Sequence, residues 1–228
     1  MVEKKKLSSQ QMIEKTIDFV REMNQNDFTG HDWWHIQRVR KLALKIATEE
    51  KADSFVVEMA ALLHDISDYK FFPGNEQKGI NILREFLGTL QLSSDLAQKI
   101  IDISTNISFM KTLPGEKKIP ENVKTLEFMV VSDADRLDAM GAIGIARAFT
   151  YGGYYHRAIY DPNVPPDPDI SQQEYQVTNA PSLNHFYEKL MKLRDFMYTS
   201  YGKKLACGRH QFLEQYLQHF YAEWEGEE

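Results

Sequence analysis

The sequence predicts an all-α protein. Apolar residues recur every three or four positions along most of the 228 residues, which places them on one face of successive helices. No stretch shows the apolar and polar alternation expected of a half-buried strand. Six of the eight prolines lie in two short segments, residues 111–120 and 161–168, which we therefore expect to be loops.

The expected helices follow one another along the chain, each with its own apolar stripe. The first follows Ser8 and Ser9, either of which can cap it, and the third begins beyond Asp53. The expected helices cover residues 13–23, 36–49, 54–65, 80–87, 96–107, 126–149, 186–198 and 205–224. With no internal repeat and no obvious linker, the chain is expected to form one domain, residues 1–228.

Composition excludes several classes of protein. Hydrophobic residues at 43% and charged residues at 26% are typical of a globular protein. A formal charge of −6 argues against a protein that coats nucleic acid or an anionic membrane. The single cysteine, Cys207, predicts no internal disulfide and no cysteine-rich metal site. The polar N-terminus and the absence of a long apolar run lead us to expect a cytoplasmic protein.

Polar groups stand at unusual places in three of the apolar segments. His64 and Asp65 follow six residues of which five are apolar, so both groups face a desolvation cost unless they are paired or bind a metal. Asp133 and Asp135 pose the same problem between apolar runs. A His–Asp hydrogen bond that caps a core helix, or a salt-bridge network in which Arg136 neutralises one aspartate and Asp138 faces solvent, would also satisfy these groups. 

A metal site explains the three segments together. Imidazole and carboxylate donors suit divalent metals of the Mn, Fe, Co and Ni kind. Helical bundles build such sites from inward-facing side chains of several helices. A histidine from the segment 31–35, the His64-Asp65 pair and an aspartate from the segment 133–138 would supply two nitrogens and two oxygens.

The order His…His-Asp…Asp resembles the HD superfamily of metal-dependent phosphohydrolases. Three strings are similar to its bacterial YedJ/YpgQ-type subgroup: His-Asp-Trp-Trp-His-Ile-Gln-Arg-Val, Leu-Leu-His-Asp-Ile-Ser-Asp-Tyr-Lys, and the string from Asp133 to Phe149. The motifs span residues 31–153. The resemblance implies a single-domain HD-type helical bundle that the C-terminal helices, residues 182–225, complete.

The resemblance also implies a ligand set. The first histidine of the signature precedes an Arg-Val helix turn and matches His35, and the doublet matches His64 and Asp65. The last aspartate matches Asp135, with Asp133 as the alternative and otherwise as a supporting or substrate-side carboxylate. The implied cofactor is one divalent transition metal, in the first place Mn²⁺, with Mg²⁺, Co²⁺, Ni²⁺ or Fe²⁺ as alternatives.

Four further residues are candidates for the reaction itself. Asp68, three positions after the doublet, matches an acidic residue that positions or activates the attacking water in the superfamily, although many relatives have the longer Glu. Lys70 is a point charge suited to a substrate phosphate. His31 is a candidate substrate contact or proton donor, and Arg147 a candidate phosphate contact that chain folding must bring closer. Each of them also has a plain structural or solvated alternative.

The expected activity is hydrolysis of a nucleotide, with a nucleoside or deoxynucleoside triphosphate cleaved to monophosphate and pyrophosphate. We expect a small phosphate substrate, no membrane partner and no stable nucleic-acid complex. A nucleotide-sensing HD protein without turnover and a phosphomonoesterase for another small phosphate ester are the alternatives. A zinc peptidase that uses His31 and His35 would leave His64 unexplained. A di-iron oxygenase would need further histidines, and residues 66–134 contain none.

Overall fold

The computed structural model is helical, as the sequence predicts. It describes residues 7–24, 27–66, 75–112, 118–171, 174 and 178–227, and none of these forms a strand. The α-helices are α1 Ser9–Met23, α2 Trp33–Glu50, α3 Ser54–Leu63, α4 Glu76–Thr89, α5 Ser94–Asn106, α6 Leu126–Asp138, α7 Gly141–Tyr154, α9 Asn184–Glu188 and α10 Ser200–Glu225. Short 3₁₀ helices are η1 Phe109–Thr112, η2 Glu121–Val123 and η3 Leu190–Phe196. No helix in the described ranges is both long and apolar enough to cross a membrane.

Helix α3 lies at the centre of the N-terminal half. It packs against α1, α2, α5 and α6, and every residue from Met59 to Leu63 is buried. The side chain of Asp53 starts this helix by accepting the backbone N–H groups of Phe55 and Val56. The expectation of a buried helix before His64 is therefore confirmed, and the end of α3 delivers His64 and Asp65 into the interior.

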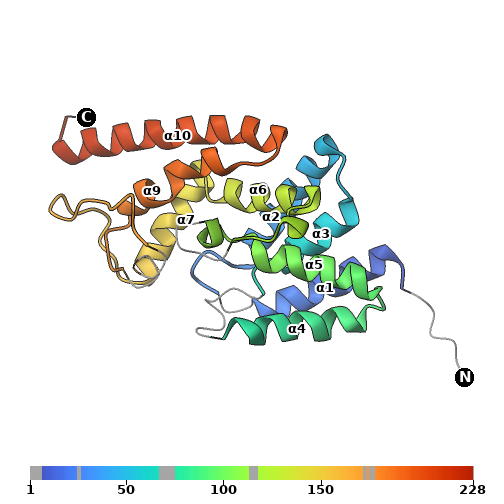
Figure 1. Ribbon diagram of the computed structural model, residues 1–228. Coiled ribbons are helices and arrows are strands. Elements are labelled where there is room, and N and C mark those ends of the chain that lie inside the picture. The colour runs from blue at the N-terminus through green and yellow to red at the C-terminus, as the bar shows by residue number, and fades with distance from the viewer. Residues whose placement is uncertain are drawn as a thin grey trace, which may run out of the picture.

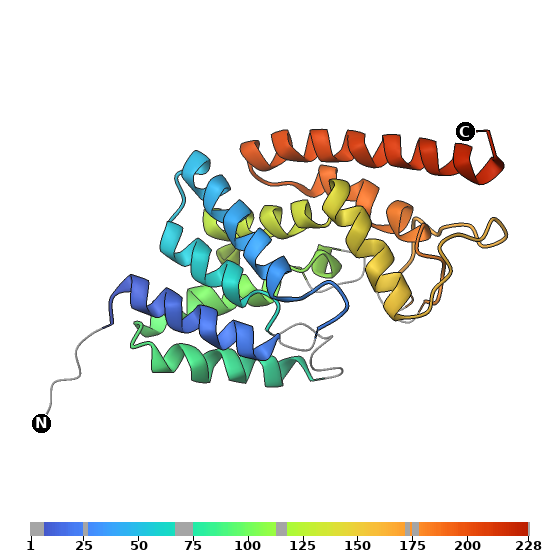
Figure 2. The same ribbon diagram turned by 180° about the vertical axis from the view of Figure 1, so that it is seen from behind.

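The long helix α10 forms one side of the molecule, and α1 and α4 form the opposite side (Figure 1). Helices α2 and α6 lie between these layers and pack against each other, and the view from behind shows the same order (Figure 2). Residues 155–171 form an irregular loop that protrudes beyond α7, as its prolines predict. The centre of the bundle is therefore where side chains from α2, α3 and α6 can meet.

The single helix expected over residues 126–149 is wrong. Helix α6 ends at Asp138, and α7 starts at Gly141, whose φ of +68° lies in the left-handed region that favours glycine. A Cβ on Gly144 would lie 2.2 Å from the carbonyl oxygen of Ala139, so the turn can close only with glycine there. The break matters because it turns α7 back on α6 and brings Arg147 to the end of α6.

The helix expected over residues 186–198 is also divided. Helix α9 ends at Glu188, the backbone of Lys189 leaves the helical region (φ −138°, ψ −60°), and η3 follows. Leu190 and Leu193 are nonetheless buried as the pattern predicts. A spacing of three residues keeps side chains on one face in a 3₁₀ helix as well, so the apolar pattern alone does not separate the two conformations.

Candidate metal centre

Two buried histidines face each other at the centre of the bundle. His35 stands in the first turn of α2 and His64 at the C-terminal end of α3, and their Nε2 atoms lie 3.2 Å apart. The Nδ1 atom of His64 lies 2.8 Å from the carbonyl oxygen of Ala61, which can only accept, so Nδ1 carries the proton. The Nδ1 atom of His35 likewise lies 2.7 Å from a carboxylate oxygen of Asp138. In the neutral imidazoles both Nε2 lone pairs therefore point at each other, and a proton or a metal ion between them removes this repulsion.

Two carboxylates complete this arrangement. His35 Nε2 lies 3.3 Å from Asp65 Oδ2 and 3.6 Å from Asp135 Oδ1. His64 Nε2 lies 3.4 Å from Asp65 Oδ1 and 3.7 Å from the same Asp135 oxygen. Donors about 2.1 Å from a common ion are roughly 3.0 Å apart at octahedral angles and roughly 3.4 Å apart at tetrahedral angles. The histidine–histidine and histidine–Asp65 distances match this spacing and the Asp135 distances are slightly longer, so the cluster has the donors of a divalent metal site.

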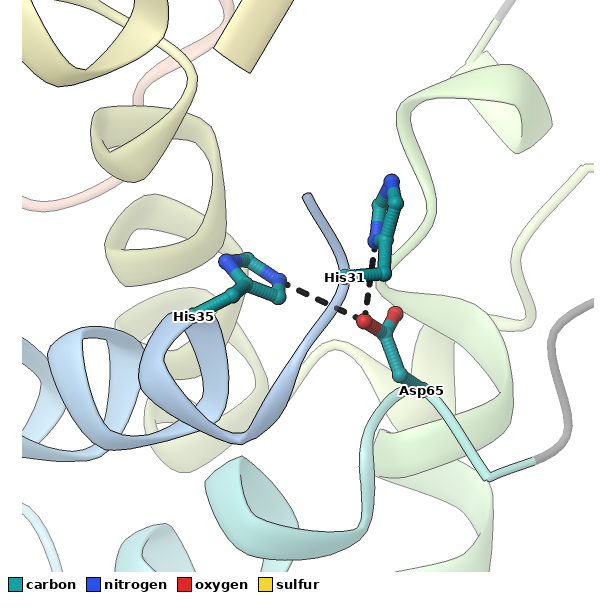
Figure 3. A group of neighbouring side chains, drawn as sticks. All are labelled: His31, His35 and Asp65. Carbon is teal, nitrogen blue, oxygen red and sulfur yellow. Dashed lines mark hydrogen bonds and ion pairs between the residues drawn. The ribbon is translucent and has the colours of Figure 1, made fainter. Parts of the chain in front are cut away.

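His31 adjoins this group from the chain segment before α2. Its Nδ1 atom lies 3.0 Å from Asp65 Oδ2, the same oxygen that faces His35, and Figure 3 shows these three side chains converging. The carboxylate of Asp27 accepts the backbone N–H groups of Thr29 and His31 and so fixes this segment. His31, His35 and Asp65 form one possible metal-binding group, and His35, His64 and Asp135 form another, so His35 belongs to both.

The two candidate aspartates of α6 point to different places. Asp135 is one-quarter exposed and faces His35 and His64. Asp133 is fully buried, and its carboxylate accepts the backbone N–H groups of Tyr198 and Thr199 and the Thr199 hydroxyl. Asp133 therefore anchors the start of α10, whose N-cap is Thr199, and lies outside the histidine cluster.

The alternative in which Asp138 faces solvent is wrong. Asp138 is buried and binds His35, Arg38 and Arg147: Arg38 donates from Nε at 2.8 Å and from Nη2 at 3.0 Å, and Arg147 Nη1 lies 3.2 Å away. The sequence did carry a signal, because Asp138 follows Asp135 by three residues and Arg38 follows His35 by three, which places each pair on one helix face.

Charges around the centre shift several pKa values. Burial favours the protonated form of Asp65, yet the charges of His64 and His31 and hydrogen bonds from His31 and His35 hold its pKa well below the usual value. Burial and the charge of Arg147 act to lower the pKa of His35, but hydrogen bonds to Asp138 and Asp65 outweigh them and raise it. A proton and a metal ion therefore compete for the same Nε2 lone pair.

Of the four residues expected to act in the reaction, the structure places two. His31 is partly buried beside Asp65, and Arg147 donates from Nε to the carbonyl oxygen of Gly30 at 3.0 Å. Asp68 and Lys70 lie outside the described residues. Asp32, the acidic residue between His31 and His35, caps α2 by accepting the backbone N–H of His35.

A helical bundle whose centre holds the sequence His…His-Asp…Asp defines a protein class, and the chain belongs to it: this is a member of the HD superfamily. The model of the family described as HD domain matches residues 33–140. The chain is 35% identical over 199 residues, 87% of each chain, to "Uncharacterized protein YpgQ" of Bacillus subtilis, and so falls in the YpgQ-type subgroup.

Solved structures agree with this assignment. A Lactobacillus plantarum protein has a TM-score of 0.82 at 35% identity, with 94% of this chain and 97% of that chain covered. A Bacillus thuringiensis protein described as an HD-superfamily hydrolase has a TM-score of 0.73 at 39% identity, covering 96% and 100%. Bacillus subtilis YpgQ in complex with ADP has a TM-score of 0.70 at 34% identity, covering 92% and 98%. The chain thus has the fold of HD-superfamily hydrolases.

Proposed function

We propose that this protein is a metal-dependent phosphohydrolase that cleaves a nucleoside or deoxynucleoside triphosphate to the monophosphate and pyrophosphate. The observation that carries the proposal is the approach of His35 and His64 to 3.2 Å with both Nδ1 atoms already bound to acceptors. Asp65 and Asp135 supply the negative charge that a divalent cation needs at this point. The nucleotide class is supported by ADP in the related YpgQ structure.

The proposed ligands are His35, His64, Asp65 and Asp135, and the proposed ion is Mn²⁺. When bound, such an ion supplies a Lewis acid for a phosphoryl oxygen and a water with a pKa lowered toward about 7. The buried histidines and Asp65 exclude bulk water on the inner side of the centre, whereas Asp135 is partly exposed and leaves the substrate an approach.

The remaining roles fall to residues around the ligands. We assign Asp68 to orienting or deprotonating the attacking water and Lys70 to holding a substrate phosphate. His31, which Asp65 and Asp27 hold in place, is assigned to the substrate side, where its imidazole can donate a hydrogen bond to a phosphate oxygen. Arg147 contributes positive charge at the same edge, because its guanidinium is fixed between Gly30 and Asp138.

The experiment is a substrate panel with the purified full-length protein. Nucleoside and deoxynucleoside tri-, di- and monophosphates are incubated with Mn²⁺, Mg²⁺, Co²⁺ or Ni²⁺, and phosphate and pyrophosphate are measured separately. Pyrophosphate release from triphosphates supports the proposal, whereas phosphate release from the monophosphates supports a phosphomonoesterase. Nucleotide binding without any product identifies a sensing protein and contradicts the proposal.

A further inference from the structure

Asp138 lies where three parts of the chain meet behind the metal centre. It is the last residue of α6, and its carboxylate contacts His35 and Arg38 of α2 and Arg147 of α7. It is 3% exposed, so substrate cannot reach it directly. The proposed reaction assigns Asp138 no step, yet burying a carboxylate with several charged partners has a desolvation cost that a structural or functional role must justify.

The contact with His35 determines which nitrogen of the imidazole can bind a cation. A neutral imidazole has one N–H and one lone pair, and the Asp138 carboxylate takes the N–H at Nδ1. Nε2 is then left with its lone pair directed at His64, 3.2 Å away. The other tautomer would place an N–H there and would turn a metal ligand into a hydrogen-bond donor.

The carboxylate itself is held from two sides. The guanidinium of Arg38 binds both oxygens, with Nε on Oδ1 and Nη2 on Oδ2, so the carboxylate plane cannot rotate away from His35. Arg147 adds a contact from Nη1 to Oδ2 and donates from Nε to the carbonyl oxygen of Gly30, which precedes His31. The network therefore links the end of α6 and the middle of α7 to His35 and to the segment that carries His31.

We propose that Asp138 is a positioning residue for the metal centre: it fixes His35 in the tautomer whose Nε2 binds the ion. Arg38 in turn holds the Asp138 carboxylate in the orientation that accepts the N–H of His35 Nδ1. The inference rests on the metal centre of the proposed function and deepens it. Metal-binding histidines commonly donate their second nitrogen to a carboxylate, and loss of such a partner typically weakens metal affinity 10–100-fold.

The first test compares Mn²⁺ affinity in full-length variants by isothermal titration or by the electron paramagnetic resonance signal of free Mn²⁺. Asp138→Leu removes the acceptor at similar size, and we expect a Kd raised roughly 10–100-fold. Asp138→Asn keeps an oxygen acceptor toward His35 Nδ1 but loses the negative charge and the acceptor for Arg38 Nε, so we expect it to recover most of the affinity. Equal affinity in the wild type and Asp138→Leu, or an equal loss in both variants, would overturn the proposal.

Asp133→Asn is the matched control, because Asp133 is a buried carboxylate of the same helix with partners in the segment before α10. We expect this variant to lower the melting temperature and to leave the Kd for Mn²⁺ within about twofold, well short of the change expected at Asp138. A loss of Mn²⁺ affinity as large as that of Asp138→Leu would mean that any buried carboxylate of α6 supports the centre, against the proposal.

A second measurement needs no variant. Long-range ¹H–¹⁵N spectra of the metal-free wild-type protein, recorded above the pKa of its imidazoles, distinguish the tautomers of His35. We expect a protonated Nδ1 and an unprotonated Nε2, and the opposite tautomer would overturn the inference. If the wild type binds Mn²⁺ but hydrolyses no nucleotide, the proposed function fails while both tests of Asp138 still stand.

Discussion

Helix α6 carries two buried carboxylates that serve different parts of the molecule. Asp133 is 0% exposed and Asp138 is 3% exposed, so their access to water is the same. Asp133 accepts hydrogen bonds from the backbone and hydroxyl of the segment that starts α10, whereas Asp138 binds two arginines and a histidine. One carboxylate fastens the C-terminal helix, and the other supports the proposed metal centre.

Their pKa values shift in opposite directions for this reason. Burial raises the pKa of Asp133, and its dipolar partners and the charge of Arg136 only reduce that effect. Burial acts in the same direction on Asp138, but hydrogen bonds from His35 and Arg38 and the charges of His35 and Arg147 lower its pKa far below the usual value. Cationic partners, more than depth, therefore decide whether a buried aspartate keeps its charge.

The largest effect is expected on the metal side of this comparison. His64→Ala removes one of the two facing Nε2 atoms and so weakens binding of the metal ion, which contributes several kcal/mol of transition-state stabilisation. We therefore expect the rate of nucleotide hydrolysis to fall by about a thousandfold or more. Initial rates of pyrophosphate release at saturating Mn²⁺ measure it. Unchanged turnover in a folded variant would contradict the metal mechanism.

A substitution at Asp133, the other buried carboxylate of α6, should lower the stability of the protein and leave metal binding unchanged. Asp133→Ala leaves the N–H groups of Tyr198 and Thr199 without their acceptor, and we expect the free energy of unfolding to fall by about 2–4 kcal/mol. Urea denaturation of the metal-free protein, followed by circular dichroism, measures the change. A variant with unchanged stability and weakened Mn²⁺ binding would contradict this prediction, because Asp133 would then support the metal centre and not α10.

The charge state of His35 should make metal binding depend on pH. Its pKa is raised above 6.5, and metal binding needs the unprotonated Nε2, so Mn²⁺ affinity should fall up to tenfold per pH unit as the pH drops below that raised value. Without metal the sign is opposite: the raised pKa contributes stability below pH 6.5, and this stability is lost as the pH rises through the folded pKa. Thermal unfolding with and without Mn²⁺ across this range tests both signs, and parallel pH profiles would contradict the account.

The smallest effect is expected for an ion pair that neither supports the metal centre nor fastens α10. Arg40 of α2 pairs with Glu58 of α3, and both side chains are partly exposed. Arg40→Gln should lower the free energy of unfolding by about 1 kcal/mol or less and leave Mn²⁺ affinity unchanged. A large loss of metal affinity in this variant would mean that the packing of α2 on α3, more than the side chains at the centre, controls the site.

The sequence predicted much of this arrangement. The apolar periodicity located most helices, and the buried character of α3 made His64 and Asp65 conspicuous because polar groups are costly there. It failed at residues 139–141, because small apolar residues fit a continuous helix and a tight turn equally well, and only Gly141 and Gly144 marked the break. The burial of Asp138 does not follow from the apolar pattern for the same reason, since it depends on α7 folding back.

The most direct test of the central claim is an anomalous diffraction map recorded at the manganese edge from crystals grown with Mn²⁺. We expect one peak about 2.0–2.3 Å from His35 Nε2, His64 Nε2 and oxygens of Asp65 and Asp135. A map with no peak among these four side chains, or with a peak bound by His31 in place of His64, would contradict it.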